Sequence, residues 1–263
     1  MSDVLQVALA VAAAAVAGAI NAVAGGGTLL TFPALIGLGV EPLTANATST
    51  VALWPGAVGS MWSYRRELAG ARSWAARFAL PSLAGGALGA WLLLRTPPAR
   101  FAALVPWLVL GATALFMAQP LLTRALERRG VGGAGQAAGN DVLPSSPPVH
   151  VLAYQFCVGI YGGYFGAGVG ILMLAVLGFM GLRNIHRMNG LKNWGGLCMN
   201  AVAALTFATR GIVHWPIALA MALGSAIGGY ATAGFAQRVP QPMVRQAVVV
   251  IGIASGLWLL ARR

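Results

Sequence analysis

Two short polar islands stand in otherwise apolar stretches, and each follows a run of small residues. The first run is 25–27 (Gly-Gly-Gly) followed by Thr28, and the second is 166–168 (Gly-Ala-Gly). The islands are 46–50 (Asn-Ala-Thr-Ser-Thr) and 189–193 (Asn-Gly-Leu-Lys-Asn). Hydroxyls, amides and one ammonium are hydrogen-bond donors that suit a small oxyanion. The candidate substrate-binding residues are Gly25, Gly26, Gly27, Thr28, Thr48, Ser49, Gly166, Ala167, Gly168, Asn189, Lys192 and Asn193.

The glycine runs are expected to break helices. Glycine costs about 1 kcal/mol relative to alanine inside a helix, so several together end it. In a bilayer, a broken backbone is tolerated only where protein or a water-filled cavity covers it. A helix that restarts after the break points backbone N–H groups and its positive dipole end at the break, which favours an anion. Two such breaks at matching positions are typical of a transporter's binding site.

The composition is that of an integral membrane protein. Hydrophobic residues make up 58% and charged residues 8% of the 263 residues, against about 25% charged in soluble domains. About 20 apolar residues span the hydrocarbon core, and Val4–Ala24 carries no charge. The predicted apolar segments are Val4–Ala24, Thr28–Val40, Leu43–Tyr64, Trp74–Leu94, Phe101–Leu122, Val149–Phe165, Val169–Leu182, Met188–Ala208, Ile212–Gln237 and Met243–Leu260.

The chain divides into two similar halves. Residues 125–148 are rich in Gly, Ser and Pro, which predicts a flexible linker between a first transmembrane repeat, 1–124, and a second, 149–263. When the sequence of the second half is shifted by 141 positions, several of its glycines align with glycines of the first half. A shift of 139 positions aligns two more pairs nearer the end of each half. The matched pairs are Gly18 with Gly159, Gly25 with Gly166, Gly27 with Gly168, Gly37 with Gly178, Gly85 with Gly224, and Gly89 with Gly228.

The distribution of positive charge favours inversion of the second half. If each broken pair is a hairpin and three helices follow it, 12 of the 17 Lys and Arg fall on one side of the membrane. The predicted fold is therefore all-α, with two inverted repeats, each a glycine-broken helical hairpin plus three transmembrane helices. Two spanning helices in place of each hairpin would give the same count. Either version places the N-terminus and the Glu41 loop outside the cytoplasm.

Other chemistry finds little support in the sequence. The acidic residues Asp3, Glu41, Glu67, Glu127 and Asp141 all fall in loops or tails, so no carboxylate is expected at membrane depth and a cation transporter is disfavoured. No acid–base or nucleophile constellation indicates an enzyme. The histidines and the two cysteines have no ligand spacing, so neither a metal nor another cofactor is expected. The net charge of +12 lies in loop arginines and does not indicate nucleic acid.

Each candidate feature also has a structural interpretation. Thr48 and Ser49 lie near a helix start, where hydroxyls commonly cap helices. Lys192 could extend to the membrane interface, and the glycines could serve close helix packing. Most tryptophans are expected in the interfacial belt, but Trp54 and Trp194 each closely follow a polar island.

The same residues carry a family resemblance. Residues 18–30 (GAINAVAGGGTLL), with Pro33 and 45–50, closely resemble the first-repeat signature of the TauE/SafE family of sulfite exporters. Residues 162–170 (GGYFGAGVG), with Lys192 and Asn193, resemble its second-repeat signature. The resemblance covers nearly the whole chain except the linker. It implies a multi-pass protein of the bacterial inner membrane that moves sulfite or organosulfonates such as sulfoacetate.

We therefore expect a secondary carrier whose partners are a small anion and the lipid bilayer. An anion channel with the same site and a non-transporting membrane subunit remain the alternatives. The 141 shift places Asn189 and Gly190 where the first half has Thr48 and Ser49. That difference leaves open which oxyanion fits.

Overall fold

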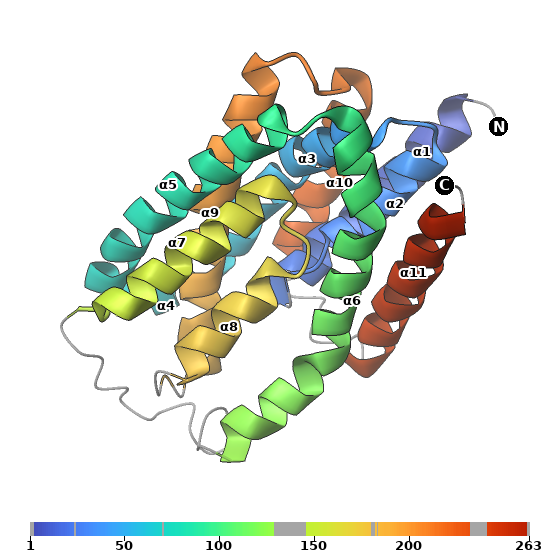
Figure 1. The fold of residues 1–263 in the computed structure, drawn as a ribbon. Helices are drawn as coiled ribbons and strands as arrows, with labels where there is room; N and C mark the ends of the chain where they lie inside the picture. Colours follow the sequence, from blue (N-terminus) through green and yellow to red (C-terminus); the bar gives the residue numbers. More distant parts are fainter. Residues whose placement is uncertain are drawn as a thin grey trace.

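The structure is a computed structural model that describes residues 3–23, 25–69, 71–128, 146–179, 182, 184–231 and 241–261, and every regular element in them is a helix. The helices are α1 (Asp3–Val23), α2 (Thr28–Gly37), α3 (Pro42–Ser63), α4 (Arg65–Ala69), α5 (Arg72–Arg95), α6 (Pro98–Arg128), α7 (Val149–Tyr164), α8 (Val169–Phe179), α9 (Ile185–Thr209), α10 (Trp215–Ala231) and α11 (Gln241–Ala261) (Figure 1). All except α4 correspond to the predicted apolar segments.

Both predicted helix breaks are present. α1 ends at Val23 and α2 begins at Thr28, while α7 ends at Tyr164 and α8 begins at Val169. α2 has 10 residues and α8 has 11, which at about 1.5 Å per residue is about half of a bilayer's hydrocarbon core. At each break, therefore, one helix ends and the next begins inside the molecule.

Two boundaries differ from the sequence predictions. α4 has five residues and includes Arg65, Arg66 and Glu67, so it has no apolar run that hydropathy could detect; its Leu68 is buried against Trp74. α6 continues to Arg128, into the predicted linker at 125–148. The rest of that linker, 129–145, lies outside the described residues.

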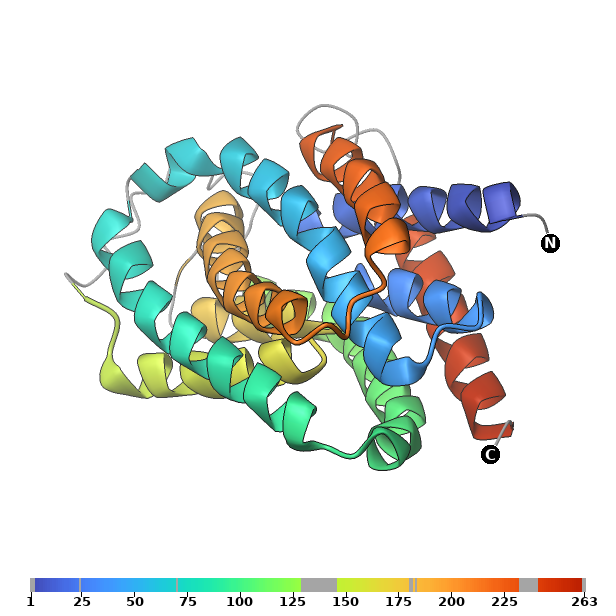
Figure 2. The same cartoon turned by 90° about the horizontal axis from the view of Figure 1, so that it is seen from above.

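The helices of the two halves are interleaved. α1 packs along α10, α7 packs along α5, and α6 packs along α11. α3 and α9 pack on each other near the middle, where Figure 2 shows α9 enclosed by α3, α5 and α7. Glycines permit these approaches: a Cβ at Gly85 would meet the Phe156 carbonyl oxygen of α7, and a Cβ at Gly228 would meet the Ala15 carbonyl oxygen of α1. Small residues at such contacts are typical of membrane helices.

The helix starts correct the register between the halves. α3, α5 and α6 begin at Pro42, Arg72 and Pro98, and α9, α10 and α11 begin 143 positions later, at Ile185, Trp215 and Gln241. The shift of 141 holds only for the broken pairs, where Thr28 corresponds to Val169. By the shift of 141, Ala15 of α1 corresponds to Phe156 of α7. Gly85 approaches Phe156 and Gly228 approaches Ala15, so Gly85 corresponds to Gly228 and not to Gly224. The shift of 139 was therefore wrong.

The surface is apolar and part of the interior is polar. Leu80 of α5 is 73% exposed and Leu223 of α10 is 70% exposed, whereas Asn46, Thr48 and Ser49 of α3 are buried. A lipid environment explains this arrangement, because lipid solvates apolar side chains. Among the described residues, α1, α5 and α6 contain apolar windows long enough to cross a membrane: Leu5–Ala22, Arg72–Arg95 and Pro98–Ala118.

Candidate functional site

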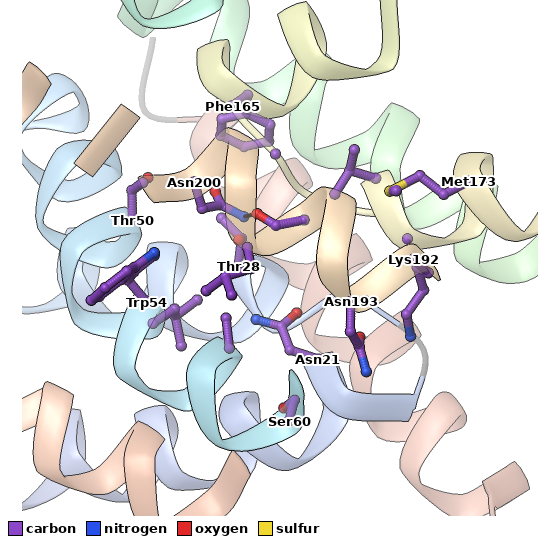
Figure 3. A pocket seen from close by; sticks show the side chains of 18 residues that line it. Asn21, Thr28, Thr50, Trp54, Ser60, Phe165, Met173, Lys192, Asn193 and Asn200 are labelled. Atoms are coloured by element: carbon purple, nitrogen blue, oxygen red, sulfur yellow. Dashed lines mark hydrogen bonds between the residues drawn. The ribbon is translucent and has the colours of Figure 1, made fainter. Parts of the chain in front are cut away.

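A cavity lies where the two broken pairs meet α3 and α9 (Figure 3). The space open to the centre of a water molecule is about 70 Å³, and about 15 Å³ of such space holds one water, so the cavity suits a small solute. The first half contributes, from α1, the first break, α2 and α3, Asn21, Gly25, Thr28, Thr50, Leu53, Trp54, Ala57 and Ser60. The second half contributes, from the second break, α8 and α9, Phe165, Gly166, Val169, Gly170, Met173, Lys192, Asn193, Gly196, Leu197 and Asn200.

Of the predicted candidates, Gly25, Thr28, Gly166, Lys192 and Asn193 line this cavity. They come from both halves of the chain, from both helix breaks and from α9. The fold therefore brings together residues that are up to 168 positions apart in the sequence.

The glycines of the breaks serve backbone geometry. Gly25, Gly166 and Gly168 have φ values of +75°, +76° and +74°, a left-handed region that costs other residues about 1–2 kcal/mol. A Cβ at Gly25 would also lie 2.6 Å from Cα of Gly170. The two breaks therefore approach each other so closely that only glycine fits.

The backbone N–H groups expected to bind a ligand are partly used within the protein. Gly25 N donates to the Ile20 carbonyl at 3.2 Å, and Gly166 N donates to the Tyr161 carbonyl at 3.0 Å. Gly27 N donates to Oδ1 of Asn21 at 2.7 Å. Because a bonded N–H has no further hydrogen to give, these three groups serve to end helices in this structure.

Three other candidates face protein. A Cβ at Gly26 would overlap the Phe116 ring, and the atoms closest to one at Gly168 belong to Ala112. The Ala167 carbonyl accepts a hydrogen bond from the Tyr161 hydroxyl at 2.6 Å. These contacts hold the breaks against α6 and α7.

Lys192 and Asn193 reach the end of α1. Lys192 Nζ and Asn193 Nδ2 each lie 3.3 Å from the Ala22 carbonyl oxygen, to which they donate. That carbonyl belongs to the last turn of α1, where carbonyls lack helical partners and the dipole is negative. Lys192 is 3% exposed, so it does not extend to the surface. It places its amino group both at a helix end and beside the cavity.

The remaining candidates, Thr48, Ser49 and Asn189, do not line the cavity. Thr48 Oγ1 accepts the His214 backbone N–H at 3.0 Å. Ser49 Oγ shares a hydrogen bond of 2.6 Å with Thr31 Oγ1. Asn189 is 7% exposed, and its Oδ1 has no hydrogen-bond partner among the described residues. Thr48 and Ser49 therefore fix neighbouring segments.

The corrected register pairs the residues that α3 and α9 present to the cavity. Each lining residue from Thr50 to Ala57 has a lining counterpart 143 positions later. The pairs are Thr50 with Asn193, Leu53 with Gly196, Trp54 with Leu197, and Ala57 with Asn200. Lys192 then corresponds to Ser49, and Asn189 to Asn46, so the two polar islands share their first asparagine but still differ at Ser49 and Lys192.

Comparison with known proteins places the chain in a family. The family model described as sulfite exporter TauE/SafE matches residues 10–259. The chain belongs to this family. Its relatives are described as probable membrane transporter proteins, and together with the apolar helices this makes the chain a multi-pass membrane protein of a transporter family.

The relatives of this TauE/SafE chain are similar along nearly their whole length. A probable membrane transporter protein, ORF9, from Sinorhizobium sp is 28% identical, over 95% of this chain and 90% of its own. The probable membrane transporter protein YfcA of Escherichia coli K12 is 26% identical, over 94% and 87%. A probable membrane transporter protein of Haemophilus influenzae is 26% identical, over 90% and 87%. No solved structure matched the chain.

The TauE/SafE cavity includes polar residues outside the candidate set. Asn21 and Asn200 line it, as do Thr50 and Trp54. Asn193, Gly196 and Asn200 are three and four residues apart, which places them on one helix face. That spacing in the sequence of α9 could have identified Gly196 and Asn200 as lying on the same face as Asn193. Asn21 stood inside the first-repeat signature without being assigned a role.

The lining residues that the structure describes are neutral or basic, and include no carboxylate, histidine or cysteine. No group of three His, Cys, Asp or Glu that could hold a metal ion occurs among the described residues. This donor set suits hydrogen bonding to a neutral or anionic solute.

Proposed function

We propose that the chain is a secondary transporter of a small sulfur-containing anion, sulfite or an organosulfonate such as sulfoacetate, in the bacterial inner membrane. The observation that carries the proposal is the cavity between the two helix breaks, lined by N–H and O–H donors and Lys192 and without a carboxylate among its described lining residues. The family's description supports a sulfur anion, and the relatives' descriptions support transport.

Charge and dipoles favour an anion in this cavity. α2 and α8 begin at Thr28 and Val169, which both line the cavity, so each presents its positive dipole end there. When Lys192 is protonated, its ammonium adds a unit charge in buried surroundings, where electrostatic interactions are strong. We retain five of the twelve predicted contacts: the side chains of Thr28, Lys192 and Asn193, and the backbone around Gly25 and Gly166.

Alternating access would follow from two inverted repeats that move relative to each other. The exchange of partners between halves, with α1 on α10 and α7 on α5, supports two related units, and the charge distribution supports their inversion. Glu41 and Asn184 precede α3 and α9 at corresponding positions. Glu41→Cys should react only with reagent added outside the cell, and Asn184→Cys only with cytoplasmic reagent. Reaction of both from the same side would contradict inversion.

Binding of anions to the purified full-length protein in detergent tests the function. The panel is sulfite, thiosulfate, sulfoacetate, taurine, sulfate and acetate. A sulfur anion should bind selectively, and Thr28→Val, which keeps the side-chain shape but removes the hydroxyl, should weaken it about fivefold or more. Thr206→Val is the matched control, because the Thr206 hydroxyl bonds to the Val202 carbonyl within α9 and does not line the cavity.

The alternatives give different results. A protein that binds none of the panel would support a non-transporting subunit and contradict the proposal. In proteoliposomes a carrier should saturate with anion concentration at low turnover. Flux that rises linearly at high rates would indicate an anion channel with the same site.

A further inference from the structure

Most polar side chains that line the cavity already have partners within the protein. Thr50 Oγ1 donates to the Asn46 carbonyl at 2.9 Å, Ser60 Oγ donates to the Gly56 carbonyl at 2.9 Å, and Asn200 Nδ2 donates to the Gly196 carbonyl at 2.9 Å. These are bonds to the preceding turn of the same helix, which satisfy donors in an apolar environment. These hydroxyls and this amide do not need a ligand.

Three donors that line the cavity have no hydrogen-bond acceptor among the described residues: Asn21 Nδ2, Thr28 Oγ1 and Trp54 Nε1. Asn21 Oδ1 accepts from Gly27 N, which fixes the amide so that its NH₂ group lies on the opposite side. In Figure 3 the Asn21 amide nitrogen and the Trp54 indole nitrogen are both turned toward the part of the cavity where Thr28 lies. A ligand with several acceptor atoms would satisfy them together.

Trp54 differs from its counterparts. Leu197, at the corresponding position of α9, lines the cavity but has no donor. Trp194, the other tryptophan that follows a polar island, donates Nε1–H to the Ala75 carbonyl at 2.7 Å. Trp54 is 37% exposed, and Leu53 and Phe165 also line the cavity. Trp54 thus offers the cavity an N–H group and an apolar ring surface.

We propose that Trp54 is a substrate-contacting residue that determines which anions are accepted. Its Nε1–H donates to an oxygen of the anionic head, in company with Thr28 and Asn21. Its ring, with Leu53 and Phe165, forms a wall for carbon atoms attached to that head. This assignment rests on the proposed anion site, and it adds that a small organic oxyanion is preferred over an inorganic one of the same head group.

The test compares two variants of Trp54 in the purified full-length protein, with sulfite, methanesulfonate, ethanesulfonate and propane-1-sulfonate as probes. For the parent, affinity should rise along the three sulfonates by up to about fourfold per methylene. Trp54→Phe keeps a ring and removes the N–H, so it should weaken all four anions about tenfold and preserve the trend. Trp54→Leu, the residue of the second half, should also flatten the trend.

The control is Trp107, which is 61% exposed on α6 and does not line the cavity. Trp107→Phe and Trp107→Leu should bind all four probes as the parent does. If the parent binds no anion, the proposed function fails and this inference with it. If the parent binds but Trp54→Phe and Trp54→Leu match it in affinity and trend, only the role of Trp54 is overturned. If Trp54→Leu does not fold, Trp54→Phe decides the donor role and the parent's trend decides the apolar wall.

Discussion

α3 and α9 occupy corresponding places beside the cavity but present different side chains to it. At positions related by the 143 shift, α3 has Thr50 and Trp54 where α9 has Asn193 and Leu197. One position before Thr50 and Asn193, Ser49 of α3 bonds to Thr31, whereas Lys192 of α9 reaches the end of α1. The repeated fold therefore supplies two similar frameworks, and the substitutions within them make a site with a basic side and an aromatic side.

The two helix breaks show the same relation between shared framework and local difference. Gly25 and Gly166 correspond and share a positive φ, but a Cβ at Gly25 would meet Gly170 of the other half, whereas one at Gly166 would meet Gly162 of the preceding helix, α7. The first break is thus constrained by the second half. Each of the following four predictions compares two positions, and in two of them the positions correspond between the halves.

The largest effect is expected at the crossing of the breaks. Gly25→Ala should lower the free energy of unfolding by more than about 2 kcal/mol, because it combines positive φ with a 2.6 Å approach to Gly170 Cα. Gly39→Ala shares the positive φ, +85°, but its Cβ meets nothing within 4 Å, so it should cost about 1–2 kcal/mol. Thermal unfolding in detergent measures both. Equal losses would mean that the breaks do not depend on close contact.

The next effect concerns Lys192 and its counterpart Ser49. Lys192→Gln should weaken binding of the anion about tenfold or more, because a charge-assisted interaction in low dielectric is lost. Ser49→Ala should leave the affinity unchanged and lower stability by about 1 kcal/mol, because Thr31 loses one of its two hydrogen-bond partners. Calorimetric titration and thermal unfolding separate the two. Unchanged affinity in Lys192→Gln would limit the lysine to its bond with the Ala22 carbonyl.

Asn46 and Asn189 provide a comparison of bonded and unbonded amides. Asn46 Nδ2 donates to the Tyr164 carbonyl at 3.0 Å, at the end of α7, whereas Oδ1 of both asparagines has no partner among the described residues. Asn46→Ala should therefore destabilise the protein by about 1 kcal/mol more than Asn189→Ala. The difference in unfolding temperature is the measurement. The opposite order would indicate that Asn189 has a partner in the folded protein, such as a bound water.

The smallest change in stability is expected when the two tryptophans are compared. Trp194→Phe removes the donor to the Ala75 carbonyl and should cost about 1 kcal/mol of stability with no change in anion affinity. Trp54→Phe should show the reverse, a loss of affinity at nearly constant stability. Measuring both properties on both variants gives a two-by-two comparison. A loss of affinity in Trp194→Phe alone would move the site away from α3.

Much of the fold could be predicted because it depends on local sequence. Long apolar runs gave the membrane helices, and the glycine runs gave the breaks after Val23 and Tyr164. α4 could not be predicted from hydropathy, because it has only five residues and includes the charged residues Arg65, Arg66 and Glu67. The register of the second polar island was wrong by two positions, because glycine matches do not reveal where a loop lengthens.

The candidate site could be predicted only in part. Sequence reasoning chose the correct regions, and five of its residues line the cavity. It could not tell that Gly27 N is already bonded to Asn21, or that Trp194 is bonded while Trp54 has no partner among the described residues. Hydrogen-bond saturation depends on neighbours in space, which a residue type does not identify.

The sequence alone determined a membrane protein of two similar halves, each with a broken helix pair and a polar island, because hydrophobicity and backbone preference are properties of short segments. The tertiary structure decided which donors face the cavity. Lys192 meets Ala22 across 170 positions, and Asn46 meets Tyr164 across 118. Contacts over such distances form only when the halves pack against each other, so the chemistry of the cavity is a property of the assembled fold.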